Sequence, residues 1–140
     1  MSARSKARKA ALDLLFETDI RGTNLLETLA LREKEIEAPD SRPIRDYTRE
    51  IIVGVSEKRR KIDELIITYA QGWDMDRLPA VDRNILRLGI YEIIWSPDVP
   101  TSVAIDEALI LAKELSSDES SQYIHGVLGT IASLKDTISF

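Results

Sequence analysis

The chain has 140 residues and a formal net charge of -5, with 19 lysines and arginines against 24 acidic residues. Apolar residues make up 44% of it, which is enough to build a core and excludes wholesale disorder. The sequence contains no cysteine and one histidine, which excludes disulfides, cysteine nucleophiles and multi-histidine metal centres. It has no run of about 18 apolar residues and no signal-peptide core, so we expect a soluble cytoplasmic protein of one domain, with no membrane partner.

The charges are distributed unevenly along the chain. Residues 1–61 contain 14 basic and 11 acidic residues, whereas residues 62–140 contain 5 basic and 13 acidic residues. Basic residues cluster at the start of the chain and again from Lys58 to Lys61. This asymmetry predicts a surface for a polyanion at one end and a different partner elsewhere, although a solvated tail and an ordinary charged helix face would give the same pattern.

The spacing of apolar residues predicts helices along the first half of the chain. One helical face covers residues 7–15, and Gly22 is expected to end that helix. Asn24 and Glu27 form a capping-box pattern at the start of a second helix, and residues 35–42 are typical of a loop.

A third helix is expected after this loop. Pro43 suits its first turn, because proline lacks the N–H that a first turn leaves unsatisfied. Gly54 and Ser56 are expected to bend or break the helix before the apolar spacing resumes and continues to Tyr69.

The second half of the chain opens with the most apolar segment. Pro79 precedes a helix that reaches about Trp95 and is apolar on most sides, so we expect this helix to lie centrally. Gly89 in its middle predicts close approach of another helix. Pro97 and Pro100 then form a rigid connection to a helix with small and apolar residues on one face.

A second capping-box pattern, formed by Ser116 and Glu119, predicts the start of the last helix. Together the segments predict an all-α protein of six or seven helices with short loops. The sequence has no Gly-rich phosphate loop, no metal-ligand spacing and no nucleophile motif, so we expect no catalytic residues, no metal and no cofactor.

Three segments carry a resemblance to a known family. They are VDRNILRLGIYEI at residues 81–93, VPTSVAIDEALILAKEL at residues 99–115 and SSQYIHGVLG at residues 120–129. Together with the basic opening at residues 3–16, they resemble the NusB family over essentially the whole chain. The resemblance implies a NusB-like fold of two roughly perpendicular helical bundles, with an N-terminal sub-bundle of about residues 1–72 and a C-terminal sub-bundle of about residues 73–140.

The resemblance also implies a function in binding and not in catalysis. NusB-type proteins are transcription antitermination factors that pair with NusE, a small-subunit ribosomal protein. The heterodimer binds the boxA RNA of ribosomal RNA leader transcripts and joins other Nus factors on RNA polymerase. The alternative is a self-associating helical adaptor, for example a homodimer, without specific RNA binding.

The resemblance places RNA binding at six positions, which are Arg4, Lys6, Arg8, Lys9, Gln122 and Tyr123. Physical reasoning supports the first four, because the start of a helix carries a partial positive charge that disfavours cations and favours phosphate. Tyr123 is the candidate for stacking on a base, with an ordinary core or surface tyrosine as the alternative. His125 is expected to pack or hydrogen-bond, and Lys58–Lys61 is expected to form a solvated helix face.

The NusE interface of the family maps onto Phe16, Asp76, Asp82 and Glu119. An acidic second half suits a basic ribosomal protein, since opposite charges speed encounter and fix orientation. Asp82 and Glu119 could also serve at helix N-termini, and Phe16 could belong to the core.

Overall fold

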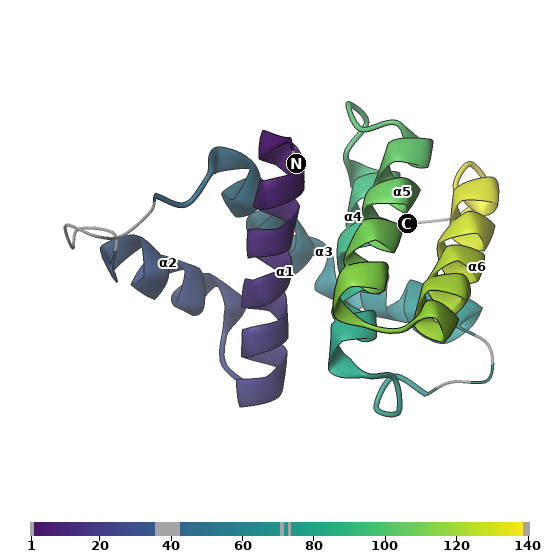
Figure 1. Cartoon of the computed structure of the whole chain (residues 1–140), viewed down its shortest axis with the longest axis horizontal. Helices are drawn as coiled ribbons and strands as arrows, with labels where there is room; N and C mark the ends of the chain where they lie inside the picture. Colours follow the sequence, from purple (N-terminus) through teal and green to yellow (C-terminus); the bar gives the residue numbers. More distant parts are fainter. Residues whose placement is uncertain (1, 36–42, 71, 73, 139–140) are drawn as a thin grey trace. The chain divides into compact units, whose positions relative to one another are not determined.

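The computed structural model describes residues 2–35, 43–70, 72 and 74–138 (Figure 1). The helices are α1 (Ala3–Arg21), α2 (Leu25–Glu35), α3 (Asp46–Tyr69), α4 (Ala80–Trp95), α5 (Thr101–Leu115) and α6 (Asp118–Leu134). The described ranges contain no β-strand, and the predicted all-α class is confirmed. None of the described helices is long and apolar enough to cross a membrane. The predicted loop at residues 35–42 lies outside the described residues, except that Glu35 ends α2.

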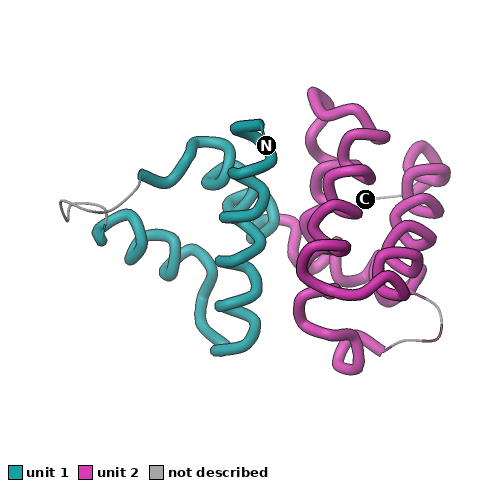
Figure 2. Tube along the Cα trace, viewed as in Figure 1, with its two compact units in different colours: residues 1–57 teal, residues 58–140 magenta. Residues whose placement is uncertain are grey.

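The chain divides into two compact units, which Figure 2 shows in teal and magenta. Unit 1 comprises residues 1–57 and includes α1, α2 and the first half of α3, and unit 2 comprises residues 58–140. The border between the units falls within α3, upstream of the border near residue 72 that the resemblance implies. The arrangement as two perpendicular bundles stays a prediction.

Unit 1 contains the helix ends that local sequence predicts. Gly22 ends α1 in the left-handed conformation with a φ of 67°, which glycine adopts without steric cost. The N–H of Glu27 donates to Asn24 Oδ1 at 3.0 Å, which confirms the predicted start of α2. Thr48 Oγ1 donates to the carbonyl oxygen of Ala7 at 2.9 Å and so attaches the first turn of α3 to α1.

Two predictions about α3 are wrong, namely that Pro43 lies in its first turn and that the helix breaks at Gly54 and Ser56. Pro43 lies before the helix, which begins at Asp46, an acidic residue that the helix dipole favours in a first turn. The helix also continues without interruption through Gly54 and Ser56. A single glycine costs a helix about 1 kcal/mol, and burial of the apolar residues around it outweighs that cost. The buried neighbours are Ile51, Ile52 and Val55.

The predicted central helix of unit 2 is confirmed. The α4 helix packs against both α5 and α6 (Figure 1), and its residues 84–93 are all buried. A Cβ atom added at Gly89 would lie 2.9 Å from Leu128 Cδ1 and 3.7 Å from Ala108 Cβ. The absence of a side chain at this position therefore lets α5 and α6 approach α4, as the sequence predicts.

The predicted capping box at the start of α6 is shifted by one residue. Ser117, and not Ser116, is the N-cap, since its Oγ accepts the N–H of Ser120 at 3.0 Å. Ser116 instead ends α5, and its backbone N–H donates to the carbonyl oxygen of Ala112. Two adjacent serines offer the same capping chemistry, so only the path of the chain decides which of them caps the helix.

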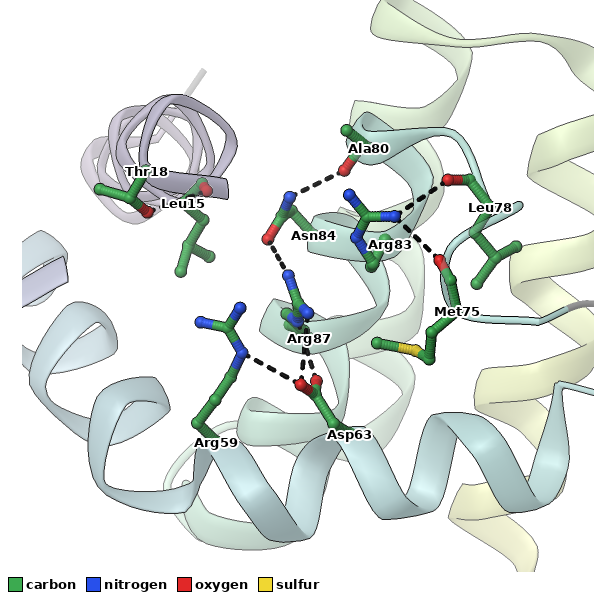
Figure 3. A network of polar contacts seen from close by, with 10 residues as sticks. All are labelled: Leu15, Thr18, Arg59, Asp63, Met75, Leu78, Ala80, Arg83, Asn84 and Arg87. Atoms are coloured by element: carbon green, nitrogen blue, oxygen red, sulfur yellow. Dashed lines mark hydrogen bonds and ion pairs between the residues drawn. The ribbon is translucent and has the colours of Figure 1, made fainter. Parts of the chain in front are cut away.

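A charged network attaches the second half of α3 to α4 (Figure 3). The guanidinium of Arg87 donates to Asp63 through Nε at 2.9 Å and through Nη2 at 3.3 Å. Its Nη1 donates to Asn84 Oδ1 at 3.0 Å. Arg59 Nε reaches the same Asp63 carboxylate at 3.2 Å. The side chain of Arg87 is only 5% exposed, so these contacts satisfy a buried charge.

Candidate functional site

The basic residues at the start of α1 differ in their exposure. Arg4 and Lys6 are exposed, and Lys9 is partly exposed and lies 3.7 Å from Asp13. We call Arg4, Lys6 and Lys9 the basic N-terminal surface. Arg8 is 2% exposed and lies outside this surface, although the sequence groups it with the others.

The backbone at this end of α1 adds to the positive potential of the basic N-terminal surface. Ser2 caps the helix by accepting the N–H of Ser5 at 3.0 Å, and its carbonyl oxygen accepts the N–H of Lys6 at 3.1 Å. The first turn contains no acidic residue. The helix dipole and the basic side chains therefore both make the potential at this helix end positive, which favours an anion such as phosphate.

An aromatic residue that the sequence gave no reason to select lies beside the basic N-terminal surface. The guanidinium carbon of Arg4 lies 4.4 Å from the ring centroid of Tyr47, and that of Arg8 lies 5.5 Å from it. Both distances are within the range of cation–π attraction. Tyr47 belongs to the first turn of α3, so its approach to α1 is a tertiary contact that helical spacing cannot reveal.

In unit 2, a hollow of about 180 Å³ brings together three of the predicted residues, Asp82, Glu119 and Tyr123. We call it the α4–α6 hollow, because its walls come from the start of α4 and the start of α6. The remaining lining residues are Leu78, Pro79 and Ser120. The hollow thus combines carboxylates with apolar and aromatic surface.

The two carboxylates of the hollow have different surroundings. Asp82 is 2% exposed, and its two oxygens accept hydrogen bonds from Ser116 Oγ at 2.7 Å and from Ser120 Oγ at 2.6 Å. It therefore connects the start of α4 to the junction between α5 and α6. Glu119 is exposed, so its carboxylate is the accessible charge of the hollow.

Tyr123 is partly buried in the wall of the hollow. Burial raises the pKa of its phenol above the ordinary value, and the negative charge of Asp82 raises that pKa further. The phenol therefore remains neutral at physiological pH.

Gln122 lies in a separate groove of about 360 Å³ between α5 and α6. Lys113, Asp118 and His125 are among the other residues that line this groove. Neighbouring positions on a helix point about 100° apart, which is why Gln122 and Tyr123 line different depressions.

The second basic run of the sequence is only partly available to a partner. Lys58 Nζ lies 5.8 Å from the ring centroid of Trp95, and Arg59 pairs with Asp63. Arg60 and Lys61 are exposed. Half of the run therefore makes contacts within unit 2.

The two remaining predicted interface residues are both accessible. Phe16 is 39% exposed on α1, an exposure at odds with the alternative that it belongs to the core. Asp76 is exposed in the turn before α4 and does not line the α4–α6 hollow. Phe16 belongs to unit 1 and Asp76 to unit 2.

The model of the NusB family matches residues 5–133. The chain belongs to the NusB family. Its members are transcription antitermination factors that bind RNA and are not enzymes, so the predicted class of function is confirmed.

Three individual relatives illustrate the similarity. A transcription antitermination protein NusB from Saccharopolyspora erythraea is 48% identical over 139 residues, covering 99% of this chain and 92% of the relative. The solved structure of NusB from T. maritima has a TM-score of 0.78 and 36% identity, covering 94% of this chain and 92% of that one. A crystal structure of the antitermination factors NusB and NusE in complex with double-stranded RNA matches with a TM-score of 0.78 and 25% identity. The match covers 93% of this chain and 96% of that one.

Proposed function

We propose that this transcription antitermination factor binds boxA RNA of ribosomal RNA leader transcripts as a heterodimer with NusE. In this proposal it then joins other Nus factors on RNA polymerase, which places its activity in the cytoplasm. The observation that carries the proposal is the basic N-terminal surface, which presents exposed cations at a helix start without an acidic residue in the first turn. The solved complex of a related NusB with NusE and RNA supports both partners.

On the RNA side, the proposal assigns phosphate contacts to the basic N-terminal surface. Exposed lysines and arginines bind phosphates by displacing counterions, so affinity depends on salt. Arg8 is buried, and its guanidinium lies against the ring of Tyr47 beside this surface. Tyr123 and Gln122 are the proposed contacts in unit 2, where the tyrosine ring offers a stacking face and the amide offers hydrogen bonds.

On the protein side, the proposal assigns the exposed Glu119, Asp76 and Phe16 to the interface with NusE. Accessible carboxylates attract a basic ribosomal protein, and an exposed aromatic ring supplies apolar contact area. Asp82 acts indirectly, because its carboxylate is bonded to Ser116 and Ser120 and so holds the start of α6 in place.

The test is a titration of labelled boxA RNA with the protein at several salt concentrations, with and without NusE. If the three residues of the basic N-terminal surface each neutralise one phosphate on a single strand, log K falls against log salt with a slope of about -2. We expect NusE to tighten binding. Absence of RNA binding, or equal affinity with and without NusE, would contradict the proposal.

A matched pair of double variants locates the RNA contact. The R4A/K6A variant removes one arginine and one lysine from the basic N-terminal surface, and we expect the slope to become shallower by about 1.4. The R60A/K61A variant removes the same charges from an exposed part of α3, and we expect binding close to that of the parent. Equal losses in both variants would mean that overall charge, and not this surface, binds the RNA.

Self-association is a separate outcome of the same experiments. Sedimentation across a concentration series, with and without RNA, measures whether the protein is a homodimer. A dimer with no dependence on the boxA sequence would instead support the helical adaptor.

A further inference from the structure

We propose that Arg83 is a positioning residue for NusE binding, because it holds the turn at residues 74–78 that carries Asp76. The inference rests on the proposed function, which assigns Asp76 to the interface, and deepens it by naming the side chain that keeps this carboxylate in place. Asp76 is exposed, whereas Arg83 is partly buried, so the role of Arg83 is indirect. Both residues and the turn belong to unit 2.

The contacts of the Arg83 side chain are the first observation. Its Nη1 donates to the carbonyl oxygen of Met75 at 2.8 Å and to that of Leu78 at 3.2 Å (Figure 3). The first acceptor belongs to the peptide group that joins Met75 to Asp76. Hydrogen bonds from a charged donor are stronger than those between neutral groups. A side chain of α4 therefore holds the backbone directly beside the proposed interface residue.

The backbone of the turn is the second observation. The N–H groups of Arg77 and Leu78 both donate to the carbonyl oxygen of Asp74, at 2.9 and 3.2 Å. These bonds close the turn on itself, and the two bonds from Arg83 attach it to α4. Asp76 therefore lies in a short segment whose backbone is held both from within and from the helix that follows.

The expected benefit for binding is entropic. Fixing the backbone of one residue costs about 1–2 kcal/mol, and a turn that is ordered before association does not pay this cost on binding. A carboxylate in a defined position also fixes the orientation of a basic partner. The positive charge of Arg83 cannot itself attract such a partner, so any loss of affinity on its removal reports on the position of the turn.

Arg77 offers a matched control in the same turn. Its side chain is 79% exposed and forms an ion pair with Asp74 at 3.9 Å, whose side chain is 80% exposed. Such an exposed pair contributes little. Replacing either arginine with methionine removes one positive charge beside Asp76, but only the change at Arg83 releases the two carbonyl oxygens.

The experiment is isothermal titration of NusE into the parent, R83M and R77M. We expect R83M to bind NusE about ten-fold more weakly, because the turn then has to be ordered on binding. R77M should bind at least as tightly as the parent, since a basic partner loses no attraction. Parental affinity of R83M overturns the inference, and so does an equal loss in R77M.

A second readout separates positioning from general damage to the fold. Titration of labelled boxA RNA without NusE should give the same affinity for R83M and the parent, because the turn at residues 74–78 is not part of the proposed RNA contacts. A parallel loss of RNA affinity overturns the inference. Thermal unfolding verifies that each variant is folded at the temperature of the titrations.

The route through Asp76 is tested by combining variants. In a D76A background, R83M should change NusE affinity by less than about two-fold, because the carboxylate that it positions is absent. A ten-fold loss in both backgrounds would mean that Arg83 acts by another route, and it overturns the inference.

R83K is the conservative variant. Both bonds come from one nitrogen, and an ammonium carries three donors, but the lysine side chain is shorter. We expect NusE binding about three-fold weaker than that of the parent, and this loss should vanish in the D76A background. Parental affinity, or a loss equal to that of R83M, overturns the inference. R83K decides the question if R83M does not fold.

Failure of the inference is distinguishable from failure of the proposed function. If the parent binds no NusE, the proposed function fails and the inference fails with it. If the parent binds NusE and D76A weakens that binding while R83M does not, only the inference fails.

Discussion

The charged residues at the start of unit 1 and those around α4 in unit 2 differ in what they contact. Arg4 and Lys6 of the basic N-terminal surface are exposed, and a polyanion can reach them. Asp82 and Arg87 in unit 2 are buried and bonded to side chains of neighbouring helices. Charged side chains are therefore accessible to a partner in one region, and they attach helices to one another in the other.

The physical reason for this difference is desolvation. A buried charge is stable only when hydrogen bonds and opposite charges replace the water that it has lost. Removing one member leaves the other uncompensated and costs several kcal/mol, whereas an exposed charge contributes about 1 kcal/mol or less. Substitutions of these buried charges in unit 2 should therefore lower stability, and substitutions on the basic N-terminal surface should lower RNA affinity alone.

The largest expected effect is that of Arg87→Ala in unit 2. The substitution removes three hydrogen bonds of a buried guanidinium, two of them to Asp63, and we expect the free energy of unfolding to fall by about 3 kcal/mol. Urea denaturation followed by circular dichroism measures it. Arg59→Ala is the control, because it removes a more exposed arginine from the same carboxylate and should cost less than about 1 kcal/mol. Equal losses of unfolding free energy in the two variants would contradict the expected difference between buried and exposed charges.

The next effect is that of Asp82→Ala. The hydroxyls of Ser116 and Ser120 lose their shared acceptor, and we expect the free energy of unfolding to fall by about 2 kcal/mol. Denaturation by urea again gives the value. A variant as stable as the parent would mean that Asp82 does not hold the α5–α6 junction.

Glu119→Ala provides the contrast within the same hollow. Its exposed carboxylate should contribute less than about 0.5 kcal/mol to stability. We expect its loss to weaken NusE binding about five-fold, because an opposite charge at the interface is removed. Isothermal titration with NusE measures the affinity, and Glu114→Ala removes an exposed glutamate of α5 as the control. Equal affinities of the two variants would remove Glu119 from the proposed interface.

The smallest effect is the pH dependence that Tyr123 contributes. Burial and the charge of Asp82 raise the pKa of its phenol in the folded protein, whereas the unfolded chain ionises near pH 10. The stability that the neutral phenol of Tyr123 contributes is fully present below about pH 10, and it is lost as the pH rises through the pKa of the folded protein. Above about pH 10 the parent should therefore lose more stability than Tyr123→Phe. Denaturation at pH 9 to 11 tests this, and parallel curves would contradict the raised pKa.

Local sequence patterns were sufficient where chemistry acts within one or two turns. Gly22 and Asn24 mark helix ends through their own backbone and side-chain geometry, and both predictions are confirmed. Gly89 within the apolar α4 predicts close approach of another helix, and the position of Leu128 confirms this prediction. The same patterns failed at Gly54, where burial maintains the helix.

The candidate site was less predictable, because exposure is not a property of a residue type. Arg4 and Arg8 are equivalent in the sequence, yet one is exposed and the other is buried beside Tyr47. Asp82 and Glu119 are both acidic residues near helix starts, yet only Glu119 is accessible. The resemblance names all four residues as candidate contacts. The fold shows that Arg4 and Glu119 are accessible to a partner, whereas Arg8 and Asp82 are buried.

The sequence by itself determined the all-α class, most helix ends, the central position of α4 and the basic character of the chain's beginning, because spacing, capping and charge are local properties. Only the tertiary structure decided which charges remain in water. The contacts between Tyr47 and α1 and between Asp82 and the α5–α6 junction join residues distant in sequence, and burial depends on such contacts.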